Sequence, residues 1–466
     1  MEWHVRASRW LRYRAENPLF LSELMMNPSL SFAPSFAARI SKLTRLLCAV
    51  SWMVATAVGA GIEWDRSTDR VVSHTDRAAS YPRAKRLSNG EILLGYHHSA
   101  GYGEYGTFVT LRKSRDDGKT WYETKDVEGP EEDYWGFSNL DFQEIAPGKI
   151  MLVTAARGKG EKGDREFETE GERSGLRVRV SEDFGETWSQ PSLIPTARGR
   201  VWEPSLVLLH SGEWEIYYAR ETQGPVVNTR PLDKEVSKKN LMPPQQIEVI
   251  RSLDQGKTWG KPTIISNEPL RRAGMPVATV LESGQPICIE ESVGDVASPY
   301  IVRPKKEGPP ERSLTQNRFG FGGAPFLLSV PGRGTLLTYH SEYMTMDLSD
   351  DIPMRWMFGN VWVQQGDAEA RVFGDGNRPW PLMEKNTGAF FASLMMKNDD
   401  TVVALASFRT DAPDGATKTE VRWIEGRIQW DPAMAPKAPA GSASSAAPSS
   451  LPAAAPEVEA PAANPE

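Results

Sequence analysis

Ser181-Glu182-Asp183-Phe184-Gly185-Glu186-Thr187-Trp188 is one of three copies of an eight-residue pattern in this chain. The pattern, S-x-D-x-G-x-T-W, begins at residues 114, 181 and 252, so that 67 and 71 residues separate successive starts. Each copy follows an apolar alternating run, as in Leu176-Arg177-Val178-Arg179-Val180. Alternation followed by a cluster of turn residues is typical of a strand, a tight turn and a returning strand.

The residue types of the pattern suit a turn. Ser and Asp side chains accept hydrogen bonds from nearby backbone N–H groups, and Gly adopts conformations that other residues resist. The Trp that ends each copy then packs the returning strand against a core. We therefore expect the three copies to be structural elements of the fold.

The pattern resembles the Asp box of the sialidase superfamily, whose members are six-bladed β-propellers. In that family the box is structural and not catalytic, so the resemblance implies that no residue of these boxes touches a substrate.

A second, weaker repeat supports this fold. It consists of a strand, a turn with Gly or Asp, and an apolar strand, and it occurs in six stretches: 81–96, 140–153, 203–218, 275–289, 324–339 and 391–405. The sequence thus predicts an all-β, six-bladed propeller of four-stranded antiparallel blades. The boxes would close the outer hairpins of the first three blades, and degenerate outer pairs would lie around 361–363 and 421–424. A β-sandwich, the alternative, explains the strands but not the sixfold recurrence.

The N-terminal 60 residues have the features of a leader. Arg39, Lys42 and Arg45 precede the apolar run 46–60, which contains an A-x-A cleavage site at Ala55-Thr56-Ala57. This order predicts a signal peptide and a secreted or periplasmic protein. An N-terminal membrane anchor is the alternative, although the run is short for a membrane span; after cleavage we expect no stable span.

The remaining boundaries follow from composition. Residues 61–433 would form the propeller, and the Ala/Pro/Ser-rich stretch 434–466 cannot bury a core and is expected to be disordered. Cleavage of the leader would leave Cys288 as the single cysteine, so no intrachain disulfide is expected.

Charge and motifs exclude several classes of partner. The formal net charge is −7 and no basic stripe is visible, which argues against nucleic acid. No metal motif is visible either, since His97 and His98 are adjacent and would point opposite ways on a strand. We expect no cofactor.

One edge of the predicted propeller gathers the polar residues. The first strand of each blade starts there and the second strand ends there, and the long polar loops 157–175, 221–245, 291–298 and 341–359 follow the second strands. Long loops on a rigid scaffold commonly carry sites. The box turns would lie at the opposite edge. The expected substrate-binding residues at this edge are Tyr81, Arg83, His97, Asp141, Arg157, Trp202, Arg220, Glu221, Met275, His340, Phe391 and Arg409.

Two carboxylates at this edge would suffice for glycoside hydrolysis, in which one protonates the leaving oxygen and the other attacks or activates water. Glu203 stands between Trp202 and Pro204 at a strand start, where partial burial would raise its pKa as a general acid requires. The partner would be Glu291 or Glu290 at a second-strand end. Strand alternation allows only one of them to face the funnel, and we favour Glu291.

Two short motifs resemble the exo-arabinanase branch of the sialidase clan: Trp202-Glu203-Pro204-Ser205-Leu206, and Gly274-Met275-Pro276-Val277 followed by a Glu that closes the next strand. The resemblance implies that Glu203 and Glu291, or Glu290, are the catalytic pair.

A third motif, Tyr81-Pro82-Arg83-Ala84, resembles loosely the sialidase motif that supplies the first of three arginines for a sialic acid carboxylate. Arg83, Arg220 and Arg409 would form such a triad. However, Phe390-Phe391 stands where a sialidase would use a Tyr.

The sequence therefore predicts a secreted exo-acting glycoside hydrolase whose partner is an oligo- or polysaccharide glycan. An exo-α-sialidase and a non-catalytic carbohydrate-binding propeller are the alternatives.

Overall fold

The computed structural model describes residues 61–73, 77–99, 107–131, 134–158, 174–197, 199–225, 227–228, 241–294, 297–305, 307–315, 322–341, 359–381, 387–411 and 417–436. Within these ranges all named elements are strands. The expected leader 1–60, the tail from 437 onward and most residues of the long loops lie outside the described residues. No helix in the described part of the chain is long and apolar enough to cross a membrane.

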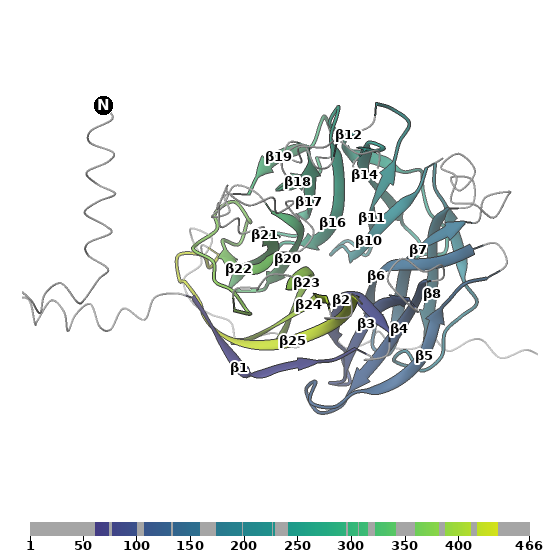
Figure 1. Ribbon diagram of the computed structural model, residues 1–466. Coiled ribbons are helices and arrows are strands. Elements are labelled where there is room, and N and C mark those ends of the chain that lie inside the picture. Colours follow the sequence, from purple (N-terminus) through teal and green to yellow (C-terminus); the bar gives the residue numbers. More distant parts are fainter. Residues whose placement is uncertain are drawn as a thin grey trace, which may run out of the picture. The chain divides into compact units, whose positions relative to one another are not determined.

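The strands form small antiparallel sheets in a propeller arrangement (Figure 1). Two four-stranded sheets come first: β2 (Ala78–Arg86), β3 (Ile92–Ser99), β4 (Thr107–Ser114) and β5 (Tyr122–Glu128), then β6 (Tyr134–Ala146), β7 (Lys149–Gly158), β8 (Gly175–Ser181) and β9 (Ser192–Pro195).

An eight-stranded sheet follows. Its two halves, each antiparallel, meet only through one parallel pair, Gln245 with Arg272. The halves are β10 (Val201–Leu208), β11 (Trp214–Glu221), β14 (Gln245–Ser252) and β15 (Thr263–Ser266), then β16 (Arg272–Val280), β17 (Pro286–Val293), β18 (Ala297–Arg303) and β19 (Glu311–Leu314). A separate hairpin pairs β12 (Val227–Asn228) with β13 (Leu241–Met242).

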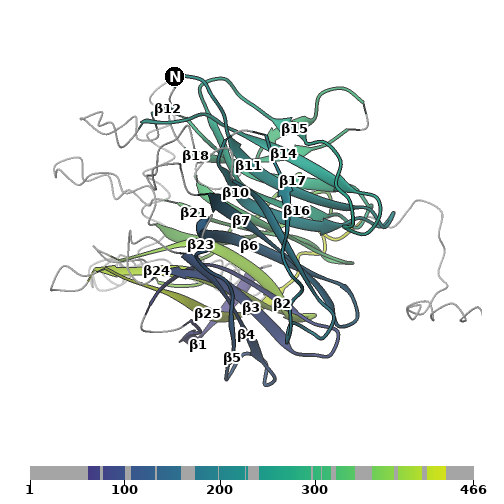
Figure 2. The ribbon, with the colours of Figure 1, turned by 90° about the vertical axis from the view of Figure 1, so that its right-hand side faces the viewer.

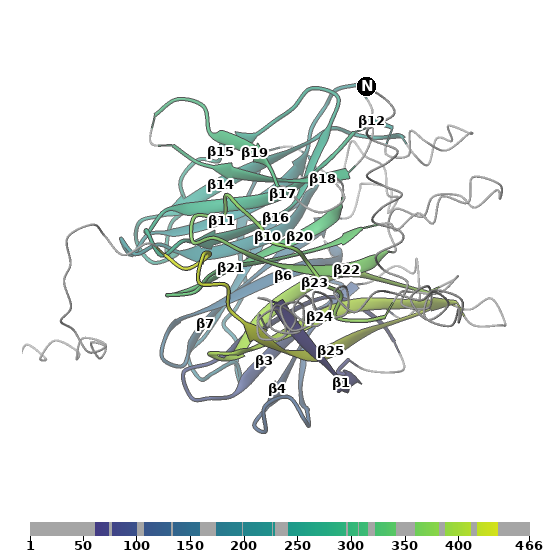
Figure 3. The same cartoon turned by 90° about the vertical axis from the view of Figure 1, so that its left-hand side faces the viewer.

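The last two sheets differ from the expected outer pairs. The three-stranded sheet is β20 (Gly323–Val330), β21 (Gly334–Ser341) and β22 (Asn360–Gly366), and only isolated bridges to Phe373 and Asn377 flank β22. The final sheet takes its outer strand from the other end of the described chain: β1 (Gly61–Val71) pairs with β25 (Thr417–Gln429), next to β24 (Thr401–Asp411) and β23 (Thr387–Asn398). Figure 3 shows β1 alongside β25.

The first strands of these groups form a closed ring. β2 contacts β6, and the contacts continue through β10, β16, β20 and β23 back to β2. Figure 2 shows the result from the side, with the sheet of β2–β5 and the strands β14 and β15 on opposite sides of the ring. Residues at the start of these first strands are therefore candidates to meet at the ring's centre.

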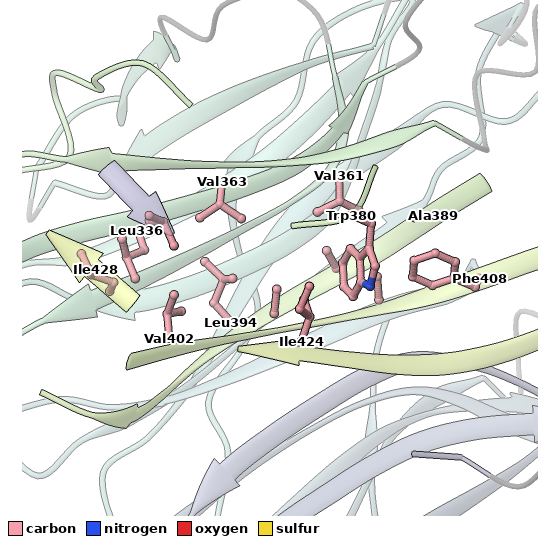
Figure 4. Packing of buried hydrophobic residues seen from close by; sticks show 14 of the residues in the cluster. Leu336, Val361, Val363, Trp380, Ala389, Leu394, Val402, Phe408, Ile424 and Ile428 are labelled. Carbon is pink, nitrogen blue, oxygen red and sulfur yellow. The ribbon is translucent and has the colours of Figure 1, made fainter. Parts of the chain in front are cut away.

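The core lies between neighbouring sheets, which explains why second strands are continuously apolar. In β24, Val402, Ala404 and Phe408 face one hydrophobic cluster, whereas Val403 and Leu405 face another. Figure 4 shows the first of these clusters, in which Trp380 packs edge-on against Phe408 with ring centroids 4.9 Å apart. A strand that is buried on both faces has no polar face to alternate.

The predicted turn chemistry of the boxes is confirmed. In the second box the N–H of Gly185 donates to Ser181 Oγ at 2.7 Å, and the N–H and hydroxyl of Thr187 donate to Asp183 at 2.9 and 2.5 Å. Gly185 has a φ of 86°, which a side chain would strain. The boxes that begin at Ser114 and Ser252 repeat the same bonds.

Register places the boxes away from the polar edge. Ser114, where the first box begins, pairs with Ile92 at the start of β3, while His97 near its end pairs with Val109. The box and the strand ends that carry the expected site residues therefore lie at opposite ends of the same sheet.

Candidate active site

All six first strands carry the same irregularity. Each breaks register with its neighbour near its start, and at the break stands a non-glycine residue with positive φ: Tyr81 (61°), Asn139 (49°), Glu203 (49°), Met275 (52°), Ala324 (43°) and Phe391 (51°). Such a bulge re-aims a side chain and bends the strand. Pro follows four of these residues, and its missing N–H suits a point where the ladder is interrupted.

Bulge residues from different sheets meet. Tyr81, Met275 and Ala324 belong to one hydrophobic cluster, and Phe391 packs against it. The rings of Tyr81 and Phe391 lie edge to face at 5.7 Å, and the Tyr81 ring stacks on His97 at 6.0 Å. Because these residues come from four of the six first strands, they form an apolar floor at the centre of the ring.

The N–H groups at the bulges find side-chain acceptors on the preceding group of strands, which for Met275 is the other half of its own sheet. Met275 N donates to Glu203 Oε2 at 3.1 Å, and Ala324 N donates to Glu291 Oε2 at 2.7 Å. In the same way Asn139 N donates to His97 Nδ1 at 3.3 Å. Both candidate catalytic carboxyls thus lie at the central bulges and are oriented by backbone donors.

Glu203 has the electrostatics of a proton donor. Burial among protein atoms, and after it the nearby charge of Glu291, raise the pKa of its carboxyl to about 7. The Met275 N–H, Arg157 and Arg272 act in the opposite direction. Its side chain nevertheless keeps some exposed surface.

Glu291 lies opposite Gly274 in the pairing of β16 with β17 and is also partly exposed. Burial raises its pKa, while the Ala324 N–H and Arg272 lower it. A Cβ on Gly323 would lie 3.0 Å from Glu291 Oε2 and 2.9 Å from His340 Nε2. Hence Gly323 leaves room for the Glu291 carboxyl and the His340 imidazole to approach the same point.

Glu290 points the other way. It is fully buried, and its carboxyl accepts bonds of 2.8 Å from Arg312 Nε and from Ser266 Oγ. The alternation expected for Glu290 and Glu291 therefore holds, and only Glu291 lies at the bulges.

Three arginines surround the centre, and each has acceptors within the protein. Arg157 stacks on Trp202 at 3.4 Å and donates to Ser138 Oγ at 3.0 Å. Arg272 donates to Pro243 O and to Glu221 Oε1, the latter at 3.3 Å. The guanidinium of Arg83 is buried, with the Tyr81 ring centroid at 4.1 Å.

His97 is neutral at ordinary pH. Burial, and after it the charges of Arg157, His98 and Arg83, lower the pKa of His97 to about 3. Its neighbour His98 lies on the other side of the strand, where it stacks on Phe108 and contacts Asp126 at 3.1 Å. No group of three or more metal-ligating side chains occurs among the residues with a described position.

Other expected site residues have different surroundings. Asp141 lies two residues beyond its bulge, buried, where it accepts bonds from Leu206 N at 2.9 Å and Ser205 Oγ at 3.3 Å. Arg220 is held by Glu248 at 2.7 Å. Arg409 is partly exposed on β24 opposite Gly388.

Sequence reasoning missed Asn139 and Arg272. Asn139 occupies the bulge of β6, but Leu140 follows it in place of Pro, so its likeness to the other bulges is hidden. Arg272 stands three residues before Met275, and its charge lowers the pKa of both central carboxyls. Asn139 is found because its positive φ recurs in the other first strands, and Arg272 is found because its charge acts on Glu203 and Glu291.

With this geometry in place, comparisons with solved structures are informative about the fold. A protein of unknown function from Dyadobacter fermentans matches with a TM-score of 0.59 at 15% identity, over 79% of this chain and 100% of that one. An α-L-arabinofuranosidase from Fusarium graminearum matches with a TM-score of 0.50 at 16% identity, over 78% of this chain and 97% of that one. A sialidase from Streptococcus pneumoniae matches with a TM-score of 0.53 at 12% identity, over 77% of this chain and 70% of that one.

No protein-family model and no curated protein matches the sequence. The similarity is therefore one of structure, and it agrees with the bulged ring of first strands. The chain has the β-propeller fold that this arabinofuranosidase and this sialidase share.

Proposed function

We propose that this protein is a secreted, exo-acting glycoside hydrolase in which Glu203 is the general acid and Glu291 is the nucleophile or general base. The observation that carries the proposal is the environment of Glu203: a carboxyl at a central bulge, with a pKa of about 7, that interacts electrostatically with Glu291. A protonated acid beside a second carboxyl is the minimum that glycoside hydrolysis requires.

The two carboxyls would work in sequence. Glu203 gives its proton to the glycosidic oxygen as the bond to the anomeric carbon breaks. Glu291 then either forms a bond to that carbon or takes a proton from an attacking water. The Met275 and Ala324 N–H groups hold the two carboxyls in place, because each binds one of them.

The floor of the centre supports exo action. Tyr81, Met275, Ala324 and Phe391 belong to one apolar cluster there, which would keep a sugar chain from passing through the ring. A site with a floor accepts a chain end more readily than the middle of a chain.

The arginines favour a neutral sugar over sialic acid. Of the triad expected for a sialic acid carboxylate, Arg83 is buried against aromatic rings and Arg220 is bound to Glu248. A carboxylate would have to replace these contacts. The α-L-arabinofuranosidase match agrees with a neutral substrate but shows the fold alone.

We also infer that the ring of first strands corresponds to six blades, with the eight-stranded sheet counted as two and β1 completing the last. The leader 1–60 would direct export, and residues 61–433 would form the propeller.

The test is a screen of the purified protein on aryl glycosides, arabinan oligosaccharides and sialyl oligosaccharides, with a Glu203→Gln/Glu291→Gln double variant as the blank. Hydrolysis of a neutral glycoside by the unmodified protein alone supports the proposal. Hydrolysis of sialosides alone would favour the sialidase. Binding of a glycan without hydrolysis would identify a non-catalytic carbohydrate-binding propeller.

A further inference from the structure

The second strand of each group has one position that recurs together with the bulge. It holds the residue that pairs with the one just before the bulge, and we call it the acceptor position. The six residues at this position are His97, Ala155, Ala219, Glu291, His340 and Ser407. Four of the six have a polar side chain, whereas the two alanines are fully buried.

Side chains at the acceptor position bind the bulge of the next group along the ring. The donors are the N–H groups of Tyr81, Asn139 and Ala324, and their acceptors are Ser407 Oγ at 3.0 Å, His97 Nδ1 at 3.3 Å and Glu291 Oε2 at 2.7 Å. A bulge takes a backbone N–H out of the strand ladder, and such a group needs another acceptor when it is buried. The acceptor position supplies one in these three cases.

Met275 follows a different pattern. The acceptor position of the group before it is Ala219, whose side chain has no polar atom. The Met275 N–H donates instead to Glu203 Oε2 at 3.1 Å, a carboxyl from the first strand of the group that contains Ala219. Ala219 packs in one hydrophobic cluster with Ala273, two residues before Met275. A polar side chain in place of Ala219 would therefore compete with Glu203 for this N–H.

The bond from Met275 also decides which oxygen of Glu203 can hold the proton. In a neutral carboxyl the carbonyl oxygen is the better acceptor and the other oxygen carries the hydrogen. Since Oε2 accepts the Met275 N–H, the proton of neutral Glu203 is on Oε1. This is the proton that a general acid must direct at the glycosidic oxygen.

We propose that Ala219 is a positioning residue: because it offers no acceptor, the Met275 N–H is left to Glu203, and this bond orients the proton of the general acid. The proposal rests on the proposed glycosidase function. It accounts for an apolar residue at a position that is polar in four of the six groups. It also explains why the carboxyl that holds this N–H comes from a first strand, unlike the acceptors of the other three bulges.

Ala219→Ser is the direct test, and Ala155→Ser is its matched control. The new hydroxyl at position 219 should accept the Met275 N–H, as Ser407 Oγ accepts that of the bulge after it, and Glu203 would lose its donor. We expect kcat to fall by about tenfold or more, a part of the 10²–10⁴-fold that acid catalysis contributes. Ala155→Ser adds the same hydroxyl to an equally buried alanine in the preceding group, where the next bulge is Glu203 itself. It leaves the Met275 N–H without a competitor and should keep kcat.

The amide of Met275 gives a readout that does not depend on activity. In protein labelled with ¹⁵N at methionine, and with the signal assigned by Met275→Leu, this amide should shift with pH as Glu203 ionises near pH 7. Glu203→Gln should abolish that titration. Ala219→Ser should abolish it as well, and Ala155→Ser should keep it. In Ala219→Ser the fall of kcat/KM with pH should also move upward, because the N–H no longer stabilises the ionised carboxyl.

Several results would overturn the role of Ala219. One is an Ala219→Ser variant that keeps the Met275 titration, and another is one that loses the titration but keeps kcat. An equal loss of kcat in Ala155→Ser would attribute the effect to any buried hydroxyl. If Ala219→Ser does not fold, Ala219→Gly, which also offers no acceptor, must keep both the titration and kcat, and loss of either overturns the proposal. If the unmodified protein hydrolyses no glycoside, the proposed function fails, while the titration still decides whether Ala219 leaves this N–H to Glu203.

Discussion

The backbone N–H of Met275 donates a 3.1 Å hydrogen bond to Glu203 Oε2, and both residues occupy the bulge of their strand, in adjacent halves of one sheet. The bulge takes the Met275 N–H out of the strand ladder, and Glu203 supplies the acceptor. One irregularity of the backbone thereby places a carboxyl and orients it.

Replacing either central carboxyl by its amide should abolish most turnover. We expect Glu203→Gln and Glu291→Gln each to lower kcat by at least about 10²-fold, the usual contribution of acid or base catalysis. Tm should move little, because the amide oxygen of Gln can still accept the Met275 or Ala324 N–H. Steady-state kinetics and thermal melts measure both.

Glu290→Gln is the matched control for these variants. Glu290 is the neighbour of Glu291 on β17 but binds Arg312 and Ser266. Its loss should affect stability more than turnover. A 10²-fold loss from Glu290→Gln together with an active Glu291→Gln would reverse the assignment.

The pKa of Glu203 makes stability depend on pH. Its pKa rises from an ordinary 4.5 to about 7 on folding, so the folded state holds more protons than the unfolded state between these values. The stability that this group contributes is fully present below pH 4.5 and is lost as pH rises to 7, a decrease of about 3 kcal/mol. Burial also raises the pKa values of Glu291, Glu290 and Glu128. These groups therefore also make the free energy of unfolding decrease as pH rises.

Comparison with Glu203→Gln isolates that one contribution. Denaturant unfolding at pH 5 and pH 8 should show a smaller decrease for the variant than for the unmodified protein. Equal decreases in both proteins would mean that Glu203 titrates normally. In catalysis the same titration should make kcat/KM of the unmodified protein fall as pH rises through about 7, because the general acid loses its proton.

The elements that the sequence predicts best are those whose cause is local. The boxes form because Ser, Asp and Gly bond and turn within eight residues, and the apolar second strands are buried on both faces whatever their neighbours are. Their type and position follow from nearby residues alone.

Non-local elements are harder to predict. β1 is largely polar in sequence, and it is a strand because β25, more than 340 residues later, offers an edge. Likewise Asp141 fits the position of a site residue by counting, but the bulge falls at Asn139. The alternation of a strand does not fix its register, and the two-residue difference between Asn139 and Asp141 decides which side chain reaches the centre.

The boxes should serve folding alone. Trp188 packs against the hydrophobic cluster between the first two sheets, so Trp188→Ala should destabilise the fold by about 3 kcal/mol, on the scale of large-to-small core changes. Its box lies at the end of the sheet away from the bulges. The folded fraction should keep the specific activity of the unmodified protein. A stable variant with lost activity would contradict this separation.

Export should remove the leader and leave β1 intact. The A-x-A site ends at Ala57 and the strand begins at Gly61, so cleavage there leaves the closing strand complete. N-terminal sequencing of exported protein should begin near Val58 or Gly61. Recovery of a full-length product embedded in the membrane would favour the anchor. A deletion of 61–71 should lower Tm strongly, because the last sheet would lose its outer strand.

Gly323→Ala tests whether the space around Glu291 matters for catalysis. The new Cβ would lie 3.0 Å from Glu291 Oε2 and 2.9 Å from His340 Nε2, closer than such contacts normally come, so these side chains must shift. Catalytic groups tolerate misplacement poorly, and we expect kcat to fall by about 10²-fold while the fold survives. Gly374→Ala is the control, since its Cβ would meet no atom closer than 3.6 Å. It should retain full activity. If Gly323→Ala also keeps full activity, the position of the Glu291 carboxyl is not limiting and its role in the reaction must be withdrawn.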